Sequence, residues 1–390
     1  MNTQLISLGL AIFSMLFGAG NLMYPLQVGM VSGDKTWIGI IGFLITAVCL
    51  PIAGFIGMIL FNGDYQAFFN RLGKPIGSSM IFICMMIIGP AIALPRITTL
   101  SHTMIAPFLP WSLLNHTTLL SSLIFSLCFL SITFVLTYKE SRIMQLLGYI
   151  ISPSLLAALL IIITKGLLFP DDLLHQAASS CFIFTSNLTR GYETLDLLGA
   201  LFFSSIIITL LKNTLGSSYE QKKAVTMALQ ASIIGVSLLG CIYVGMSLLG
   251  AYHGQAFHDG NAGELFRAIS FKVLGAHGAF IIATAVLMAC LSTAIALAAV
   301  VAEYLHGEIF HKRISYVPSL IIVLASCLPL SIAGLSQVLA LTGGIITYVG
   351  YPVLIALTFC NIAYKTCGFT PVKLPVALTF IGALTSYLMA

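Results

Sequence analysis

Long apolar runs separated by short polar connections make up most of this sequence. Each run approaches the ~20 consecutive apolar residues that a helix needs to cross a bilayer, and only helices and closed barrels satisfy their own backbone polar groups in lipid. The sequence therefore predicts an all-α polytopic membrane protein with about 11 transmembrane helices. The predicted spans cover roughly residues 5–31, 37–60, 76–107, 117–137, 143–165, 190–211, 224–251, 275–304, 315–333, 336–361 and 374–390.

Charge is scarce and is confined mainly to the connections. Charged residues make up 7% of the 390 positions, whereas soluble domains carry roughly 25%. The net charge of +5 lies mostly between apolar runs, so it describes membrane topology, and we expect no nucleic-acid partner. The 9 cysteines lie mostly inside apolar runs and form no Cys-x-x-Cys pair, which indicates small buried side chains rather than a metal site or disulfides.

The distribution of lysine and arginine predicts the orientation of the chain. With the N-terminus inside, the inner connections collect 11 basic and 5 acidic residues, and the outer connections collect 6 basic and 7 acidic residues. Cytoplasmic connections of membrane proteins are enriched in Lys and Arg. We therefore expect a multi-pass protein with a cytoplasmic N-terminus.

The first apolar run is interrupted between Ser14 and Pro25, where it reads SMLFGAGNLMYP. Gly18 and Gly20 weaken a helix in its middle, and Asn21 places an amide side chain there. Pro25 has no N–H group and fits best within the first turn of a new helix. The pattern predicts a helix that is broken near the middle of the membrane.

The two predicted half-helices are Leu5–Phe17 and about Leu22–Val31. The carbonyl end of the first half is partly negative and suits a cation, whereas the N–H end of the second half is partly positive and suits a carboxylate. The alternative interpretation of this stretch is a small-residue face of the Gly-x-x-x-Gly kind, which packs helices together.

A second interruption is expected in the sixth span, where Leu198–Ser205 reads LGALFFSS. It lies five spans after the first, which predicts a 5+5 inverted repeat with broken first and sixth helices. Paired broken helices at corresponding positions are the best sequence indication of a transporter's binding site. The predicted units are residues 1–165 for the first repeat, 166–365 for the second repeat and 366–390 for an additional C-terminal span.

Four stretches of the sequence share a family pattern. They are Phe17–Pro25 (FGAGNLMYP), Gly42–Pro51 (GFLITAVCLP), Gly89–Thr98 (GPAIALPRIT) and Ala289–Glu303 (ACLSTAIALAAVVAE). In these stretches the chain resembles the branched-chain amino acid:cation symporter (LIVCS) family, which usually has one span more than the eleven expected here. The resemblance implies the inverted-repeat fold of the amino acid–polyamine–organocation superfamily. It also implies import of Leu, Ile and Val with a cation, by alternating access, across the inner membrane of a bacterium.

The resemblance further implies which residues bind the two ligands. The cation, expected to be Na⁺, would bind the carbonyl oxygens and hydroxyls of Ser14, Phe17, Ala289, Ser292 and Thr293. The implied substrate-binding residues are Gly18, Ala19, Gly20, Asn21, Phe203 and Ser204. Within this set the substrate carboxylate would meet the N–H groups of Ala19 and Gly20, while Asn21 and Ser204 resemble positions that hold a second cation.

Sodium is favoured over protons as the coupling ion. The hydroxyls of Ser292 and Thr293, together with backbone carbonyls, supply oxygen ligands without a formal charge. The alternative for these hydroxyls is hydrogen bonding to the preceding turn of their own helix. Proton coupling usually shows an ionisable group deep in a span, and His102 in the third run is the sole candidate in mid-span. Protons therefore stay the alternative coupling ion.

Arg96 is the one basic residue well inside an apolar run. A charge at that depth should face a cavity or a partner, and Glu193 and Asp196 are the candidate partners. Two interpretations are equally supported: an outer gate of the transport path, and a structural ion pair or snorkelling at the membrane surface.

Other functions are less well supported by the sequence. They are transport of another neutral amino acid or small solute by the same fold, driven by sodium or protons, and a membrane enzyme. We expect no enzyme, because no nucleophile–base pair or phosphate-binding loop is recognisable. The expected partners are an amino acid substrate and membrane lipid, with no obligate protein partner and no cofactor beyond the coupling ion.

Overall fold

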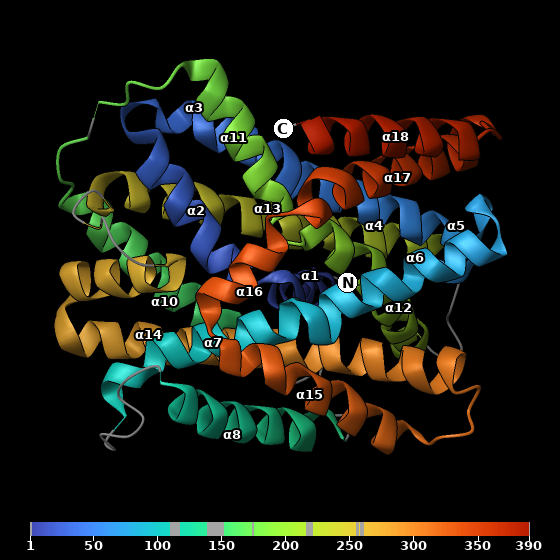
Figure 1. Cartoon of the computed structure of the whole chain (residues 1–390), viewed down its shortest axis with the longest axis horizontal. Coiled ribbons are helices and arrows are strands. Elements are labelled where there is room, and N and C mark those ends of the chain that lie inside the picture. The colour runs from blue at the N-terminus through green and yellow to red at the C-terminus, as the bar shows by residue number, and fades with distance from the viewer. Residues whose placement is uncertain are drawn as a thin grey trace.

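The computed structural model describes residues 2–109, 118–138, 152–173, 175–215, 221–254, 257 and 261–389. The secondary structure of these residues is helical throughout, which confirms the prediction of an all-α protein. Eight helical stretches are long and apolar enough to cross a membrane, and three shorter apolar helices accompany them. Figure 1 shows the helices packed side by side in one bundle.

The helices outside the two breaks are α3 (Thr36–Leu44), α4 (Leu50–Leu60), α5 (Tyr65–Phe69), α6 (Lys74–Met86), α7 (Ala93–Ile105), α8 (Leu119–Thr137), α10 (Ser152–Leu168), α13 (Gln221–His253), α14 (Ala262–Tyr304), α15 (Tyr316–Ala333), α16 (Leu335–Thr342), α17 (Tyr351–Cys367) and α18 (Lys373–Met389). Most of these helices overlap predicted spans, but α14 begins at Ala262, before the predicted start at residue 275, and the predicted span 336–361 is divided between α16 and α17. The first part of the predicted fifth span, residues 143–151, lies outside the described residues. The count of eleven crossings and the three predicted units stay predictions.

The first broken helix is present as predicted. It consists of α1 (Asn2–Leu16) and α2 (Ala19–Ser32). Between them Gly18 has an extended backbone, with φ −110° and ψ −163°. The side-chain oxygen of Asn21 accepts a hydrogen bond of 3.0 Å from the Gly18 N–H group. This local cap explains why the second half begins at Ala19, earlier than the predicted start at residue 22.

Pro25 does not lie in the first turn of α2, so this detail of the prediction is wrong. It lies inside the helix, in its second turn. Because proline has no N–H group, the carbonyl of Asn21, four residues earlier, receives no hydrogen bond from that position. Pro25 therefore weakens the hydrogen bonding of α2 one turn after the break.

The sixth apolar run is also broken, but at a different place from the prediction. Helix α11 (Ser180–Tyr192) is followed by α12 (Asp196–Leu215), with residues 193–195 between them. Leu195 in this gap has a positive φ of 67°. The predicted interruption at residues 198–205 is wrong, because this stretch is continuous helix within α12, where the Ser204 hydroxyl donates to the carbonyl of Ala200 at 2.6 Å.

The connection predicted at residues 166–189 is shorter than expected. Helix α11 occupies its second half and starts at Ser180. The side chain of Ser179 caps it by accepting a hydrogen bond of 3.2 Å from the N–H group of Phe182. The polar residues of α11 lowered the apparent hydropathy of this part, so the sequence pattern placed the start of the sixth span too late.

The third apolar run is kinked at Gly89 and Pro90. Helix α6 continues into a short segment at Ile87–Ala91, and Gly89 within it has non-helical angles of φ −98° and ψ −119°. A Cβ on Gly89 would lie 3.1 Å from a methyl carbon of Val301. The kink therefore brings the backbone close to α14 and redirects α7 across the bundle.

Helices α1 and α2 lie in the middle of the bundle (Figure 1), where both pack against α13 and α14. Small residues allow a very close approach of α2 to α13. A Cβ on Gly29 would lie 1.7 Å from the carbonyl oxygen of Ser247, and one on Gly250 would lie 2.1 Å from that of Leu26. The first broken helix is thereby fixed between helices that belong to the second half of the chain.

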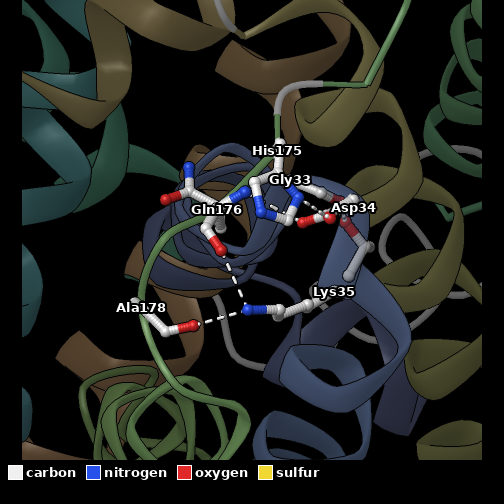
Figure 2. A network of polar contacts seen from close by, with 7 residues as sticks. Gly33, Asp34, Lys35, His175, Gln176 and Ala178 are labelled. Carbon is white, nitrogen blue, oxygen red and sulfur yellow. Dashed lines mark hydrogen bonds and ion pairs between the residues drawn. The ribbon is translucent and has the colours of Figure 1, made fainter.

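A polar network joins the far ends of the two broken runs, as Figure 2 shows. The Asp34 carboxylate, in the turn after α2, accepts a hydrogen bond of 3.0 Å from the N–H group of Gln176 and lies 2.6 Å from Nδ1 of His175. Lys35 donates to the carbonyls of Gln176 and Ala178, at 2.8 and 2.7 Å. We call the set of Asp34, Lys35 and residues 175–178 the latch.

A second contact lies near the latch, in the same connection. Asp171 accepts a hydrogen bond from Lys272 of α14 and lies 3.3 Å from Nδ1 of His253, at the end of α13. The hydrogen bond from Lys272 holds the pKa of Asp171 below its usual range. The connection before α11 is therefore tied to α14 and α13 as well as to the turn after α2.

Candidate functional site

A small cavity of about 30 Å³ lies between the two breaks. Its wall is formed by residues of α1, α2, α7, α12 and α14 together with both break segments. Apolar side chains cover much of it, including Leu16, Phe203 and Leu297. The polar part of the wall comes from residues at the ends of broken helices, so the fold places helix ends and apolar side chains around one small space.

The predicted cation ligands come together at the end of α1. The hydroxyls of Ser14 and Ser292 lie 2.9 Å apart. The Thr293 hydroxyl lies 3.1 Å from the carbonyl oxygen of Phe17 and 3.2 Å from that of Ala289. Although the α14 residues are more than 270 positions distant from α1 in sequence, one cluster contains oxygens from all five residues, which we call the oxygen cluster.

Hydrogen bonding to the preceding turn of its own helix does not account for all contacts of the Thr293 hydroxyl. Its contact with the Ala289 carbonyl is the bond to the preceding turn that helix hydroxyls often make. The same oxygen also lies 3.5 Å from the carbonyl oxygen of Ser14. That carbonyl is free of its usual helix partner because the Gly18 N–H group donates to the Asn21 side chain instead. The break thus directs unused carbonyls toward α14.

The partly positive end of α2 adjoins this cluster. Ala19 and Gly20 are its first two residues, and N–H groups of the first helical turn have no acceptor within the helix. Gly18 and Ala19 line the cavity, whereas Gly20 is not among its lining residues. The N–H group of Gly18 is occupied by Asn21, so Ala19 and Gly20 supply the donors closest to the break.

Gly20 faces the second break at very close range. A Cβ at this position would lie 2.9 Å from Nη2 of Arg96 and 3.2 Å from the Cα of Thr194. Glycine is therefore required here for the two breaks to approach each other, in addition to any role of its N–H group.

Asn21 has partners that the sequence did not reveal. Its side-chain nitrogen donates to both carboxylate oxygens of Asp196, at 2.7 and 2.9 Å, and also contacts the hydroxyl of Tyr243. That hydroxyl donates to Asp196 at 2.6 Å. Asp196 was considered from sequence only as a partner for Arg96, and Tyr243 lies in the middle of an apolar run without any distinguishing pattern. The structure adds both residues to the site.

Ser204 and Phe203 lie further along α12. Phe203 lines the cavity and is 2% exposed, whereas Ser204 is fully buried and is not among the lining residues. Eight positions separate Ser204 from Asp196, or about two helical turns. The Ser204 hydroxyl donates to the carbonyl of Ala200, and the Asn21 side chain bonds to Asp196. A second cation held by Asn21 and Ser204 stays a prediction.

Arg96 bonds to the backbone of the second break and forms no ion pair with the two predicted acids. Its Nη1 donates to the carbonyl of Glu193 at 2.7 Å, and its Nη2 donates to that of Thr194 at 3.2 Å. The side chain is 3% exposed and lines the cavity, and its Nε has no hydrogen-bond partner. Snorkelling to the membrane surface is therefore excluded, and Arg96 connects the cavity to the carbonyl end of α11.

Within the described part of the chain, no cluster of three or more His, Cys, Asp or Glu residues could hold a metal ion. The oxygens at the α1 break are hydroxyls and carbonyls, which bear no formal charge.

The fold is shared with solved transporter structures. One neighbour is a Na⁺-coupled sialic acid symporter in a substrate-bound outward-open state, with a TM-score of 0.56, 11% identity, and coverage of 97% of this chain and 88% of that chain. Another is a manganese transporter of Eremococcus coleocola, with a TM-score of 0.57, 15% identity, and coverage of 98% and 86%. At these identities the likeness establishes the fold alone.

Sequence relatives indicate the class of transporter. The branched-chain amino acid permease BraB of Bacillus subtilis is 30% identical over 369 residues, which cover 92% of this chain and 80% of the permease. The branched-chain amino acid transport system 3 carrier protein of Pseudomonas aeruginosa is 29% identical, with 92% and 80% covered. These relatives are named as permeases and carriers, and the protein is accordingly not an enzyme.

The family match extends over the whole chain. The family described as branched-chain amino acid transport protein matches residues 1–390. The resemblance in the four sequence stretches is thereby confirmed, together with the multi-pass membrane character common to bacterial members. This chain belongs to the branched-chain amino acid transport protein family.

Proposed function

We propose that this protein imports branched-chain amino acids into a bacterial cell by symport with a cation, sodium, through alternating access. The observation that supports this most directly is the first break. The oxygen cluster lies on one side of it, and the partly positive end of α2 lies on the other. A cation and a carboxylate could therefore bind within a few residues of each other, and each ligand would raise the affinity for the other.

The substrate class follows from the relatives and the cavity together. The relatives named above are carriers of branched-chain amino acids, and the cavity has apolar side chains such as Leu16 and Phe203 beside its helix ends. An apolar pocket discriminates between substrates by roughly 1–3 kcal/mol per methylene. Leu, Ile and Val should accordingly bind better than Ala or Gly.

Sodium suits the oxygen cluster because its ligands bear no formal charge. Thr293 supports this assignment, since its hydroxyl lies near carbonyls of both α1 and α14. Protons are the second candidate for the coupling ion. The observation that favours them is Asp196, a carboxyl group 3% exposed at the second break, where the sequence had offered His102 alone.

We also propose a transport cycle based on an inverted repeat, which the two breaks support, and a cytoplasmic N-terminus, which the distribution of Lys and Arg supports. In this arrangement the half-helices on either side of each break could open the cavity alternately to the two faces of the inner membrane. Arg96 would take part as a gate, because it joins the cavity wall to the carbonyl end of α11.

Uptake into liposomes tests this proposal. Purified protein is reconstituted, and entry of labelled leucine is measured under an inward sodium gradient, under an inward proton gradient without sodium, and in protein-free liposomes. We expect accumulation with sodium, and competition by unlabelled Ile and Val. Full uptake driven by protons alone would contradict sodium coupling, and strong competition by a different solute, with none by Ile and Val, would contradict the substrate.

A further inference from the structure

Asp196 is a buried carboxyl group in the wall of the cavity. It is the first residue of α12, directly after the second break, and is 3% exposed. In the part of the chain that the structure describes, no Lys, Arg or His lies within ion-pair distance of it. A carboxylate removed from water is costly unless it is hydrogen-bonded and paired with a cation. The described part of the protein provides the hydrogen bonds but no cation at ion-pair distance.

The hydrogen bonds around Asp196 are donated to it. Asn21 donates through its side-chain nitrogen, and Tyr243 donates through its hydroxyl. These are groups that stabilise an ionised carboxylate, which accepts hydrogen bonds at about four positions on its two oxygens. Three contacts are made by these two residues, and Asp196 itself lines the cavity.

Arg96 does not neutralise this carboxylate by contact. Both of its terminal nitrogens donate to backbone carbonyls, those of Glu193 and Thr194. Its unpartnered Nε and its closeness to Gly20 place positive charge beside the start of α2. The cavity therefore has a positive part, formed by Arg96 and the α2 end, and a negative part, formed by Asp196.

These two parts lie next to each other, because Asn21 of the first α2 turn holds Asp196 directly. A zwitterionic amino acid has the same pattern: its carboxylate and ammonium groups are attached to one carbon, and its side chain extends away from both. The apolar wall at Leu16, Phe203 and Leu297 completes the match. Anionic solutes without an ammonium group would leave Asp196 buried and unpaired.

We propose that Asp196 binds the α-ammonium group of the transported amino acid. This inference rests on the proposed function, because it takes an amino acid as the substrate, and it adds the residue that distinguishes amino acids from carboxylic acids of the same shape. Asn21 and Tyr243 act as positioning residues, because they are uncharged and orient the carboxylate through hydrogen bonds.

The test compares two ligands that differ only at the ammonium group. L-Leucine and 4-methylpentanoate share a carboxylate and an isobutyl side chain, but 4-methylpentanoate has hydrogen in place of the ammonium group. Each is titrated separately against purified protein in saturating sodium, and apparent affinity is taken from ligand-induced thermal stabilisation. For the wild type we expect leucine to bind at least about 30-fold more tightly, because loss of one partner of a buried charge pair has effects of this order.

Three variants test whether Asp196 causes the preference for leucine over 4-methylpentanoate. Asp196→Asn keeps the size of the side chain and removes its charge, so leucine affinity should fall by about 30-fold or more, while 4-methylpentanoate affinity stays the same or improves. Asp196→Glu retains the charge and should keep a clear preference for leucine. Tyr243→Phe removes one hydrogen bond to Asp196 and is the matched control, which should also keep the preference.

Several outcomes would overturn the inference. Equal binding of both ligands by the wild type would do so without any variant, which covers the case in which Asp196→Asn does not fold. Equal weakening of the binding of both ligands in Asp196→Asn would mean that Asp196 stabilises the fold. A changed sodium dependence with an unchanged preference for leucine would mean that Asp196 binds the cation. Absence of stabilisation by Leu, Ile and Val in the wild type would instead contradict the proposed function.

Discussion

The two breaks interrupt their helices by different means. At the first break, Gly18 adopts an extended backbone and Asn21, three residues later, caps it, so the interruption is made by neighbouring residues. At the second break the gap contains no glycine, and Leu195 adopts a positive φ of 67°. That conformation is costly for a side chain with a Cβ. Hydrogen bonds of Thr194 within the segment, with the carbonyl of Gly191 and the N–H group of Asp196, offset part of this cost.

Arg96 adds further hydrogen bonds from a distant helix. It lies almost 100 positions before the second break and donates to two consecutive carbonyls there. A planar guanidinium group can bond two carbonyls at once, which a single ammonium group does less well. The conformation of the first break is thus set by residues of its own segment, whereas that of the second break also depends on a helix distant in sequence. The comparison predicts that substitution of Arg96 will affect the second break more than the first.

The largest effect is expected where the two breaks meet. Gly20→Val adds a branched side chain where even a Cβ would lie 3.2 Å from the Cα of Thr194. Because backbone atoms cannot move aside cheaply, we expect leucine uptake in liposomes to be lost while the protein still inserts into the membrane. Gly382→Val is the matched control, since a Cβ there meets nothing within 4 Å. Near-normal uptake by Gly20→Val would show that the breaks do not need this close approach.

A smaller loss is expected from Arg96→Lys, which affects the second break. Lysine keeps the charge but cannot reproduce both bonds to Glu193 and Thr194, and a hydrogen bond to a charged group contributes about 1.5–3 kcal/mol. Uptake should fall about 10- to 100-fold. Arg190→Lys is the control, because Arg190 makes a single bond of 3.2 Å to the side chain of Gln27. Equal losses in the two variants would contradict the assigned role of Arg96.

The same contrast explains what the sequence could predict. The break at Gly18 was predicted correctly because glycine, asparagine and proline act on their own neighbourhood. The break at Leu195 was misplaced, because the glycine and serines at residues 199–205 are tolerated in a continuous helix and the bonds from Arg96 are invisible in the sequence. The family resemblance named residues of the oxygen cluster, whereas Tyr243 has no local pattern that could have indicated it.

An intermediate effect, dependent on sodium, is expected at the first break. Thr293→Ala removes one oxygen from the cluster and leaves the apolar wall intact. The sodium concentration for half-maximal leucine uptake should rise roughly tenfold, the effect of about 1.4 kcal/mol in ion binding, and uptake should recover at high sodium. Phe203→Ala is the control, because saturating sodium cannot replace a lost apolar contact. An unchanged sodium dependence in Thr293→Ala would place the cation elsewhere.

The smallest effect is expected from the latch, which joins the two broken runs at their exposed ends. Asp34→Asn weakens the contact with His175, whose side chain is 82% exposed, while the bonds of Lys35 to two carbonyls remain. Exposed ion pairs contribute little because water and salt screen them, so leucine affinity should change by roughly threefold at most. Lys35→Met removes the carbonyl contacts as well, and the comparison of the two variants in sodium-driven uptake separates their contributions. A loss in Asp34→Asn as large as that in Arg96→Lys would mean that the latch, and not the interior contact, fixes the second break.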